Sequence, residues 1–416
     1  MSPTRSGARG RRHAPGAGRA PADRNSGPEL SGTNLVRAGD HNQRVTLHAI
    51  RVNGPVTRAE IAGMTGLTPA SIANITNRLL EDRLVLRAGH QRGVRGQPAV
   101  KYVINPDSCF SLGLNIDRDH VTMIVLDFVG TIRARVSREI AFAKPAHVRR
   151  FVSRSIDQLL GKVGIARDRL IGMGVAFPDD LARTRLPEQP DDYDVWATVR
   201  VDTMLGDLLG IPVFLENDAA AAAIGEMQFG AGHHYRSFFY LLVTAALGGG
   251  LVADGSYFRG ANGRSGEIGW LHSRTALGDV EQLQRIVSLS ALYSRLAAEG
   301  IRVTSPADLG GVGLAGRGVI DAWIEEATNA LLDSFVAINC LINPEAILIG
   351  GRLPAALIDR LASALNLRLG RSAAQVPAVA PVSRAALADD APAVGAAILP
   401  FSDRFLPTRY ALLKSA

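Results

Sequence analysis

Two polar residues, Asn217 and Asp218, lie between a short apolar segment at 211–215 and an alanine-rich stretch at 219–229. A carboxylate in such a position can act as a general base that accepts the proton of a hydroxyl group. The same amide and carboxylate can instead serve only as a hydrogen-bond donor and acceptor for hydroxyl groups. A third interpretation is structural, because Asp218 is a good N-cap for a helix that begins in the alanine-rich stretch. The residues alone leave these three interpretations open.

The chain also contains the signals of two consecutive short helices near its N-terminus. Thr57 and Glu60 have the spacing of a capping box, and Gly66 is a natural end for the helix that they begin. Thr68 and Pro69 then open the next helix. Helix, short glycine-containing turn and helix is the helix-turn-helix arrangement, so the positions of these signals predict that motif.

The second of these helices is amphipathic, with Ile72, Ile75 and Leu79 on its apolar stripe. The residues that we expect to face DNA are Thr68, Ala70, Ser71, Asn74, Asn77 and Arg78. Asparagine can bond adenine at two points, and serine can bond bases or phosphates, so this face suits the major groove. The alternative is that Asn74 and Asn77 are ordinary solvated surface residues.

A β-wing is predicted directly after these helices. Residues 84–86 form a short apolar strand, and alternating Val100, Tyr102 and Ile104 form its returning partner. The glycine-rich loop between them carries Arg92 and Arg95. Arginines at the tip of a wing can contact phosphates or the minor groove, so both are candidate DNA-binding residues.

Charge and composition limit the class of protein. The 416 residues carry a net charge of +7, and residues 1–105 hold 16 Lys or Arg against six Asp or Glu. A basic first quarter favours a nucleic-acid-binding unit at 41–105, while residues 1–40, rich in Arg, Gly and Pro, are expected to be a disordered basic tail. Two cysteines exclude a disulfide framework, and no apolar run is long enough to predict a transmembrane helix. We therefore expect a cytoplasmic protein.

The segments at 54–85 and 93–116 resemble the N-terminal units of ROK-family transcriptional repressors, and residues 111–416 resemble the ROK sugar-kinase domain. The resemblance implies an α/β fold with a winged helix-turn-helix followed, at 106–416, by two RNase-H-like lobes of the actin-like ATPase class. The C-terminal helix is expected to return to the first lobe. Strands are expected at 112–116, 121–127, 132–137 and 171–176, and also on both sides of a turn within 237–253.

The same resemblance implies a set of sugar-binding residues. Asn217 and Asp218 would bond sugar hydroxyls, and so would Glu267, with Asn262 lining the same pocket. Trp270 would either stack on a sugar ring or fill the space of a lost metal loop. Glu281 would either reach the sugar or be an ordinary carboxylate at the start of a helix.

Three departures from the family pattern argue against kinase activity and a metal. The first phosphate loop lacks its two glycines and carries Asp117 and Asp119, which repel polyphosphate. The second loop is reduced to residues 244–246, and the glycines at 248–250 are expected to serve a tight turn. The stretch 273–281 has no cysteine, and His272 alone cannot hold a structural zinc, so neither metal nor cofactor is expected.

These observations predict a DNA-binding transcriptional regulator, most simply a repressor of carbohydrate genes, that is not an enzyme. Its partners would be a double-stranded DNA operator and a small carbohydrate effector, and it would act as a homodimer or tetramer without a membrane partner. Two alternatives stay open. The chain can be a sugar kinase with a DNA-binding unit, or a regulator whose body binds a partner protein.

Overall fold

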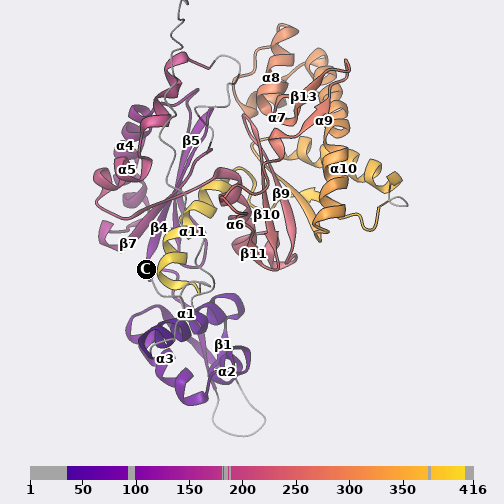
Figure 1. Cartoon of the computed structure of the whole chain (residues 1–416). Coiled ribbons are helices and arrows are strands. Elements are labelled where there is room, and N and C mark those ends of the chain that lie inside the picture. Colours follow the sequence, from indigo (N-terminus) through magenta and orange to yellow (C-terminus); the bar gives the residue numbers. More distant parts are fainter. Residues whose placement is uncertain are drawn as a thin grey trace, which may run out of the picture.

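The computed structural model describes residues 35–91, 99–179, 181, 186, 189–372 and 376–407. A small N-terminal unit lies below two larger lobes, and each of the three parts contains a sheet (Figure 1). Within the described residues, the structure contains no helix of the length and apolarity that spanning a membrane requires.

The N-terminal unit combines three helices with a three-stranded antiparallel sheet in the order β1-β3-β2. Its elements are α1 (Leu35–Asn53), β1 (Val56–Thr57), α2 (Arg58–Thr65), α3 (Pro69–Glu81), β2 (Val85–Gln91) and β3 (Ala99–Ile104). Because α1 begins at Leu35, the expectation of disorder up to residue 40 is wrong for its last part. The arginine-, glycine- and proline-rich composition ends before residue 35, and helix formation begins there rather than at residue 41.

Local signals begin and end the two short helices as predicted. Thr57 caps α2, donating its backbone N–H to Glu60 Oε2 at 2.7 Å, and Gly66 ends the helix in the left-handed conformation. Thr68 caps α3, where its hydroxyl accepts the N–H of Ser71 at 3.2 Å. Ile72 of the predicted apolar stripe is fully buried, which fixes the opposite face of α3 toward solvent.

The first lobe is a five-stranded mixed sheet in the order β6-β5-β4-β7-β8. Strands β4, β5 and β6 pair in antiparallel fashion. Strands β7 and β8 run parallel to β4. Its strands are β4 (Phe110–Ile116), β5 (His120–Asp127), β6 (Ile132–Glu139), β7 (Leu170–Ala176) and β8 (Val213–Glu216). Helices α4 (Pro145–Val163) and α5 (Val201–Leu209) accompany this sheet, and buried apolar residues of α4 pack against β4 and β5.

The second lobe repeats the pattern, with the strand order β11-β10-β9-β14-β15. Its strands are β9 (Phe238–Val243), β10 (Leu247–Ala253), β11 (Ser256–Tyr257), β14 (Ala346–Gly351) and β15 (Val382–Arg384), with a separate hairpin of β12 (His272–Arg274) and β13 (Val280–Gln282). Its helices are α7 (Leu283–Ile286), α8 (Leu289–Ala298), α9 (Leu314–Leu341) and α10 (Ala355–Ser372). The repeated mixed sheet confirms the two-lobed α/β class predicted from the sequence.

Two helices lie between the lobes, α6 (Asp218–Phe229) and the C-terminal α11 (Ala391–Phe405). Small residues let them approach closely. A Cβ atom at Gly395 of α11 would overlap the carbonyl oxygen of Ala221 in α6, and one at Gly113 of β4 would overlap that of Ala393. Tight packing of this kind transmits displacement from one element to the next.

The glycine run at 248–250 does not form the predicted turn. The turn lies at residues 244–246, and all three glycines belong to strand β10. A Cβ atom on Gly250 would meet α6, and one on Gly249 would meet the carbonyl oxygen of Gly266. The run therefore allows a helix and a loop to approach a strand, which a periodicity argument along one segment does not reveal.

Candidate functional site

A pocket between the two lobes brings together four of the six residues predicted to bind an effector. They are Asn217, Asp218, Glu267 and Trp270. The pocket lies beside the ends of strands β7 and β8, where Asp179 and Asn217 follow in the chain. Its cavity volume is about 50 Å³, and the pocket is partly open to solvent.

The start of α6 holds the first two of these residues. Asn217 is the N-cap, and its side-chain oxygen accepts the N–H groups of Ala219 and Ala220 at 3.0 and 3.1 Å. This replaces the structural interpretation in which Asp218 was the cap. Asp218 is the first helical residue, and its carboxylate accepts the N–H of Ala219 at 2.8 Å. The side-chain amide of Asn217 is left as the donor for the pocket.

Asp218 is held in an unusual electrostatic state. Burial raises the pKa of its carboxyl group to about 7, and the nearby negative charge of Asp117 acts in the same direction. The backbone N–H of Ala219 and the charge of Arg118 lower it only in part. Near neutral pH this group can therefore either donate or accept a hydrogen bond, which suits a hydroxyl-bearing ligand.

The opposite wall is the loop that precedes Trp270. Arg264 donates from Nε to Glu267 Oε1 at 2.8 Å, so one predicted ligand-binding carboxylate already has a partner inside the pocket. Trp270 is 40% exposed and lines the same cavity, which is the position expected of a stacking surface rather than of a buried filler. A hydroxyl-bearing ligand would compete with Arg264 for Glu267.

Two predicted effector residues do not line this pocket. Asn262 is exposed in the loop before Arg264, and Glu281 lies on β13, where its carboxylate pairs with Arg285 at 3.5 Å. The hairpin β12–β13 includes the stretch 273–281. Its backbone hydrogen bonds include Thr275 N–H to the Asp279 carbonyl at 2.8 Å, and these bonds hold the loop together.

The pocket also contains residues that the sequence did not single out as binding residues. Arg118, Asp179 and Gln284 line it, together with Thr244 from the turn between β9 and β10. Asp179 was the one with a usable signal, because it follows the predicted strand that ends at Ala176, and the ends of neighbouring parallel strands meet at one edge of a sheet. Gln284 comes from a distant helix and carries no local signal.

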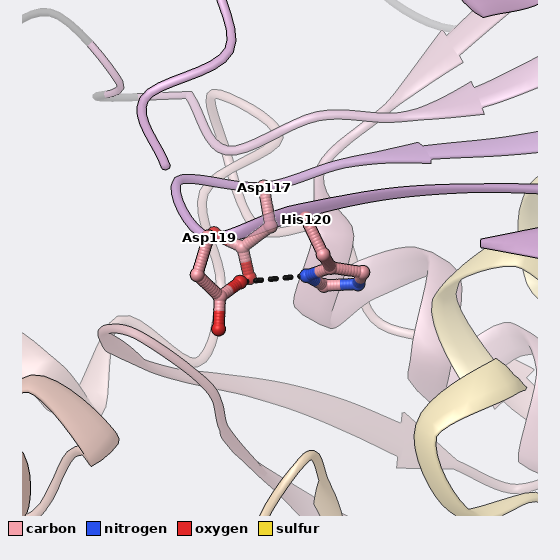
Figure 2. Close-up of side chains that lie close together, drawn as sticks. All are labelled: Asp117, Asp119 and His120. Atoms are coloured by element: carbon pink, nitrogen blue, oxygen red, sulfur yellow. Dashed lines mark hydrogen bonds and ion pairs between the residues drawn. The ribbon is translucent and has the colours of Figure 1, made fainter. Parts of the chain in front are cut away.

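The turn between β4 and β5 holds Asp117, Asp119 and His120, whose ligand-type atoms lie within 4.8 Å of one another (Figure 2). His120 donates from Nδ1 to Asp119 Oδ1 at 2.6 Å, and Asn115 donates to its Nε2 at 3.1 Å. Asp117 Oδ1 accepts the backbone N–H of Arg118 at 2.7 Å. The cluster is an internal hydrogen-bond network, which explains why these polar side chains are tolerated in the protein interior.

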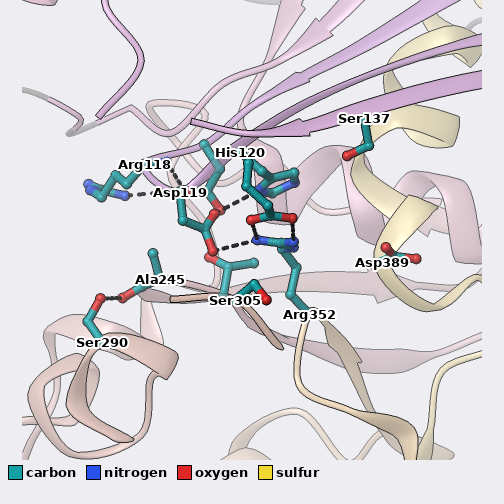
Figure 3. Close-up of polar contacts among 12 residues, drawn as sticks. Arg118, Asp119, His120, Ser137, Ala245, Ser290, Ser305, Arg352 and Asp389 are labelled. Atoms are coloured by element: carbon teal, nitrogen blue, oxygen red, sulfur yellow. Dashed lines mark hydrogen bonds and ion pairs between the residues drawn. The ribbon is translucent and has the colours of Figure 1, made fainter. Parts of the chain in front are cut away.

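An arginine of the second lobe completes this network (Figure 3). Arg352 follows β14, and its guanidinium donates to Asp119 Oδ2 at 2.6 Å and to Glu139 Oε2 at 3.1 Å. Burial alone would raise the pKa of Asp119, but the hydrogen bond from His120 and the charge of Arg352 hold it below its usual value. Two carboxylates of the first lobe are thus paired across the cleft with one cation of the second.

The turn at 244–246 is also occupied by contacts within the protein. The hydroxyl of Ser290 donates to the carbonyl oxygen of Ala245 at 2.6 Å, and the N–H of Leu289 donates to the carbonyl oxygen of Thr244 at 2.9 Å (Figure 3). These carbonyls therefore accept bonds from the start of α8. Backbone groups of this turn serve the second lobe itself.

In the N-terminal unit, α3 presents Ala70, Asn74 and Arg78 to solvent. Asn77 is exposed too, but its side-chain oxygen accepts a hydrogen bond from Arg58 NH2 at 2.6 Å, and the same guanidinium bonds Thr76 at 2.8 Å. Asn77 thus helps to fix α3 against α2, a role that its position on the helix did not reveal. Arg92 and Arg95 lie outside the described residues.

The raised pKa of Asp218 predicts a pH-dependent stability. Between about pH 4 and pH 7 the folded protein keeps a proton that the unfolded chain releases, so the free energy of unfolding falls as pH rises through this range. Because Asp218→Asn does not titrate, the variant should exceed the parent by about 2–4 kcal/mol above pH 7 and by little near pH 4. Melting temperatures of the variant and the parent across this pH range test the prediction. The control is Asp207→Asn, a change at an exposed residue of α5. Parallel curves for Asp218→Asn and its parent would contradict the prediction.

Comparison with known proteins places the whole two-lobed part in one family. A model of the ROK family matches residues 111–402, which extend from β4 into α11. The xylose repressor of Bacillus subtilis is 27% identical over 229 residues, which are 55% of this chain and 59% of the repressor. The DNA-binding transcriptional dual regulator NagC of Escherichia coli is 24% identical over 346 residues, which are 78% of this chain and 84% of NagC.

Solved structures agree on the fold. A ROK family transcriptional regulator, described as a homologue of the Escherichia coli Mlc protein, superimposes with a TM-score of 0.65 at 20% identity, covering 88% of this chain and 96% of its own. A ROK family glucokinase from Streptomyces griseus, in complex with glucose and AMPPNP, superimposes with a TM-score of 0.53 at 22% identity. It covers 70% of this chain and 98% of the glucokinase.

Proposed function

The chain belongs to the ROK family, whose model matches residues 111–402, and from this we propose that it is a DNA-binding transcriptional repressor controlled by a sugar or sugar derivative. Helix α3 binds an operator, and the pocket between the lobes binds the effector without phosphoryl transfer. The names of its relatives, a xylose repressor and a DNA-binding dual regulator, support this proposal.

The observation that carries the proposal is the contrast between the two halves of the cleft. The pocket retains Asn217, Asp218 and Glu267 as groups that can bond hydroxyls. Next to it, where the family resemblance would put nucleotide phosphates, the carboxylates of Asp117 and Asp119 face the incoming charge, and Arg352 is already neutralised by Asp119 and Glu139. The one cation of this turn, Arg118, is paired with Asp117, so a polyphosphate meets two carboxylates there, whereas a neutral polyol meets no such repulsion.

Helix α6 supplies a direct physical connection from the pocket to the N-terminal unit. Its first residues line the pocket, and its last residues, Gln228 and Phe229, contact Arg51 of α1. The guanidinium donates to Gln228 and lies 5.6 Å from the centre of the Phe229 ring. Twelve helical residues span about 18 Å as one rigid rod, so a displacement at Asp218 reaches α1.

The C-terminal helix adds a second contact to the same element. Arg44 of α1 donates to the backbone carbonyls of Asp403 and Leu406 at 2.8 and 3.1 Å. Since α11 packs closely against α6 through Gly395 and Ala221, the two helices move together. In a homodimer with two α3 helices on a two-fold operator, a small rotation of α1 changes the spacing of those helices and hence operator affinity.

The test begins with the full chain and fragments of its own genome. We expect sequence-selective binding at moderate salt, since nonspecific attraction alone follows from the basic N-terminus. A thermal-shift screen of neutral sugars, amino sugars and sugar phosphates then identifies an effector, and the effector is expected to release the operator. Absence of any selective DNA binding would refute the repressor function.

Asp218→Ala is expected to abolish release by the effector while leaving operator affinity unchanged, because Asp218 lies in the pocket and far from α3. Coupling energies of about 1–3 kcal/mol correspond to a 5- to 150-fold change in operator affinity, and this factor should fall to one. Asp207→Ala, an exposed change on α5, should respond like the parent. If the effector still releases the Asp218→Ala variant fully from the operator, this pocket is excluded as the effector site.

The variant Arg51→Met tests whether the contact between α6 and α1 couples effector binding to operator release. The methionine keeps apolar contact with Phe229 but removes the bond to Gln228, so effector and operator should each still bind while release weakens. Unchanged release would exclude the contact between α6 and α1 as the route. Formation of ADP with any hexose would instead favour a kinase, and co-purification of a protein partner without any sugar-induced shift would favour a protein-binding body.

A further inference from the structure

A second cavity lies in the first lobe, outside the effector pocket. It has a volume of about 230 Å³ and is formed where strand β6 and the segment after it meet helix α4. Its lining residues are Arg138, Ile140, His147, Arg150, Phe151, Arg154 and Ser155. None of them lines the effector pocket, and α4 lies along the outer side of the first lobe (Figure 1).

Three arginines with exposed side chains line this cavity. Arg150 and Arg154 are four residues apart on α4 and therefore share one face, and Arg138 comes from β6. Across the described part of the chain, no hydrogen bond or ion pair satisfies any of the three. By contrast, Arg135, which lies on the same strand as Arg138, forms an ion pair with Asp390 at 2.7 Å. Unpaired like charges around one cavity attract an anion.

The rest of the lining favours a small ligand over bulk solvent. Phe151 is 5% exposed and Ile140 is half-buried, so the floor is apolar, and the buried Ser155 places a hydroxyl at the same wall. His147 accepts the backbone N–H of Lys144 at Nδ1, at 3.3 Å, which leaves Nε2–H as a further donor. Cationic donors above an apolar floor can hold an anionic group attached to a carbon skeleton.

We propose that this cavity binds the phosphate group of a small phosphorylated molecule. Guanidinium groups bond phosphate oxygens two at a time, and a phosphate monoester near neutral pH supplies almost two negative charges to three cations. The cavity volume of about 230 Å³ offers room for a small ester. The cavity belongs to the first lobe, whereas the proposed DNA-binding helix α3 belongs to the N-terminal unit. The regulator thus has a second binding site for a small molecule, separate from its effector pocket.

The test is a calorimetric titration of the full chain with inorganic phosphate and with glucose 6-phosphate, at constant ionic strength set with sodium chloride. We expect saturable binding that weakens on the order of tenfold or more in the double variant Arg150→Gln/Arg154→Gln, because charge-assisted hydrogen bonds are lost. The matched control is Arg149→Gln/Lys162→Gln, which removes the same charge from exposed positions of the same helix.

Saturable binding that is kept in the control and in Asp218→Ala, but lost in the double variant, supports the proposal and distinguishes this cavity from the effector pocket. Equal weakening in the control variant would mean that phosphate responds only to net charge, which overturns the proposal. Absence of saturable binding of both probes to the parent protein overturns it as well. Neither measurement involves DNA, so the result is independent of the repressor function.

Discussion

Asn74→Ala is expected to weaken operator binding about thirtyfold or more while leaving affinity for unrelated duplex DNA nearly unchanged. Asn74 is exposed on α3, and within the described residues its side chain has no hydrogen-bond partner. A paired contact between asparagine and adenine discriminates by about 1–3 kcal/mol. A homodimer on a two-fold operator makes this contact twice, so the loss reaches about 2–6 kcal/mol, and a change of about thirtyfold corresponds to about 2 kcal/mol.

The measurement is a fluorescence anisotropy titration of labelled operator and of a scrambled duplex at one fixed salt concentration. Gln158→Ala, which removes an exposed amide from α4, should bind both duplexes like the parent. A proportional loss on operator and scrambled duplex would mean that Asn74 contacts only the DNA backbone, and the base-reading role would then be wrong. Asn77→Ala should act more mildly on base specificity, because the Asn77 oxygen is bonded to Arg58.

The parts that the sequence predicted well are those governed by neighbouring residues. The capping box of Thr57 and Glu60, the left-handed Gly66 and the cap at Thr68 all act within one helical turn, and the structure contains each of them. The opening strands of the first lobe were likewise visible as apolar runs, because both faces of that sheet are covered.

The parts that the sequence did not predict depend on distant residues. Asn77 looked like a free base-reading amide because its partner Arg58 is on another helix, and the glycines at 248–250 looked like a turn because α6 and the loop at Gly266 approach them from elsewhere. The pocket shows the same limit. Its edge at Asn217 and Asp218 was found from local pattern and family resemblance, but Gln284 enters from the second lobe without any signal nearby.

The ion pair between Asp119 and Arg352 is the clearest case of a contact that the sequence did not predict, because its two residues are 233 positions apart in the chain. Two carboxylates that repel a polyphosphate were expected from the sequence, but nothing near them in the chain indicated how the protein tolerates them. Arg352 side-chain exposure is 9% and that of Asp119 is 20%, so both charges are largely removed from water. Their pairing compensates the desolvation and joins the two lobes at the same time.

Arg352→Met is therefore expected to lower the free energy of unfolding by about 3–5 kcal/mol, because it leaves Asp119 largely buried without its cation. The second variant, Asp119→Asn/Arg352→Met, should recover part of this loss, since the only carboxylate then left without Arg352 is that of Glu139, which is 47% exposed to solvent. The matched control is Arg384→Met, whose partner Asp359 is bonded at 2.9 Å in an exposed pair, and its cost should stay below about 1 kcal/mol. Melting curves of the parent, the two variants and the control measure these differences in the free energy of unfolding. Equal shifts for Arg352→Met and Arg384→Met would show that the ion pair between the lobes contributes no more than a surface pair.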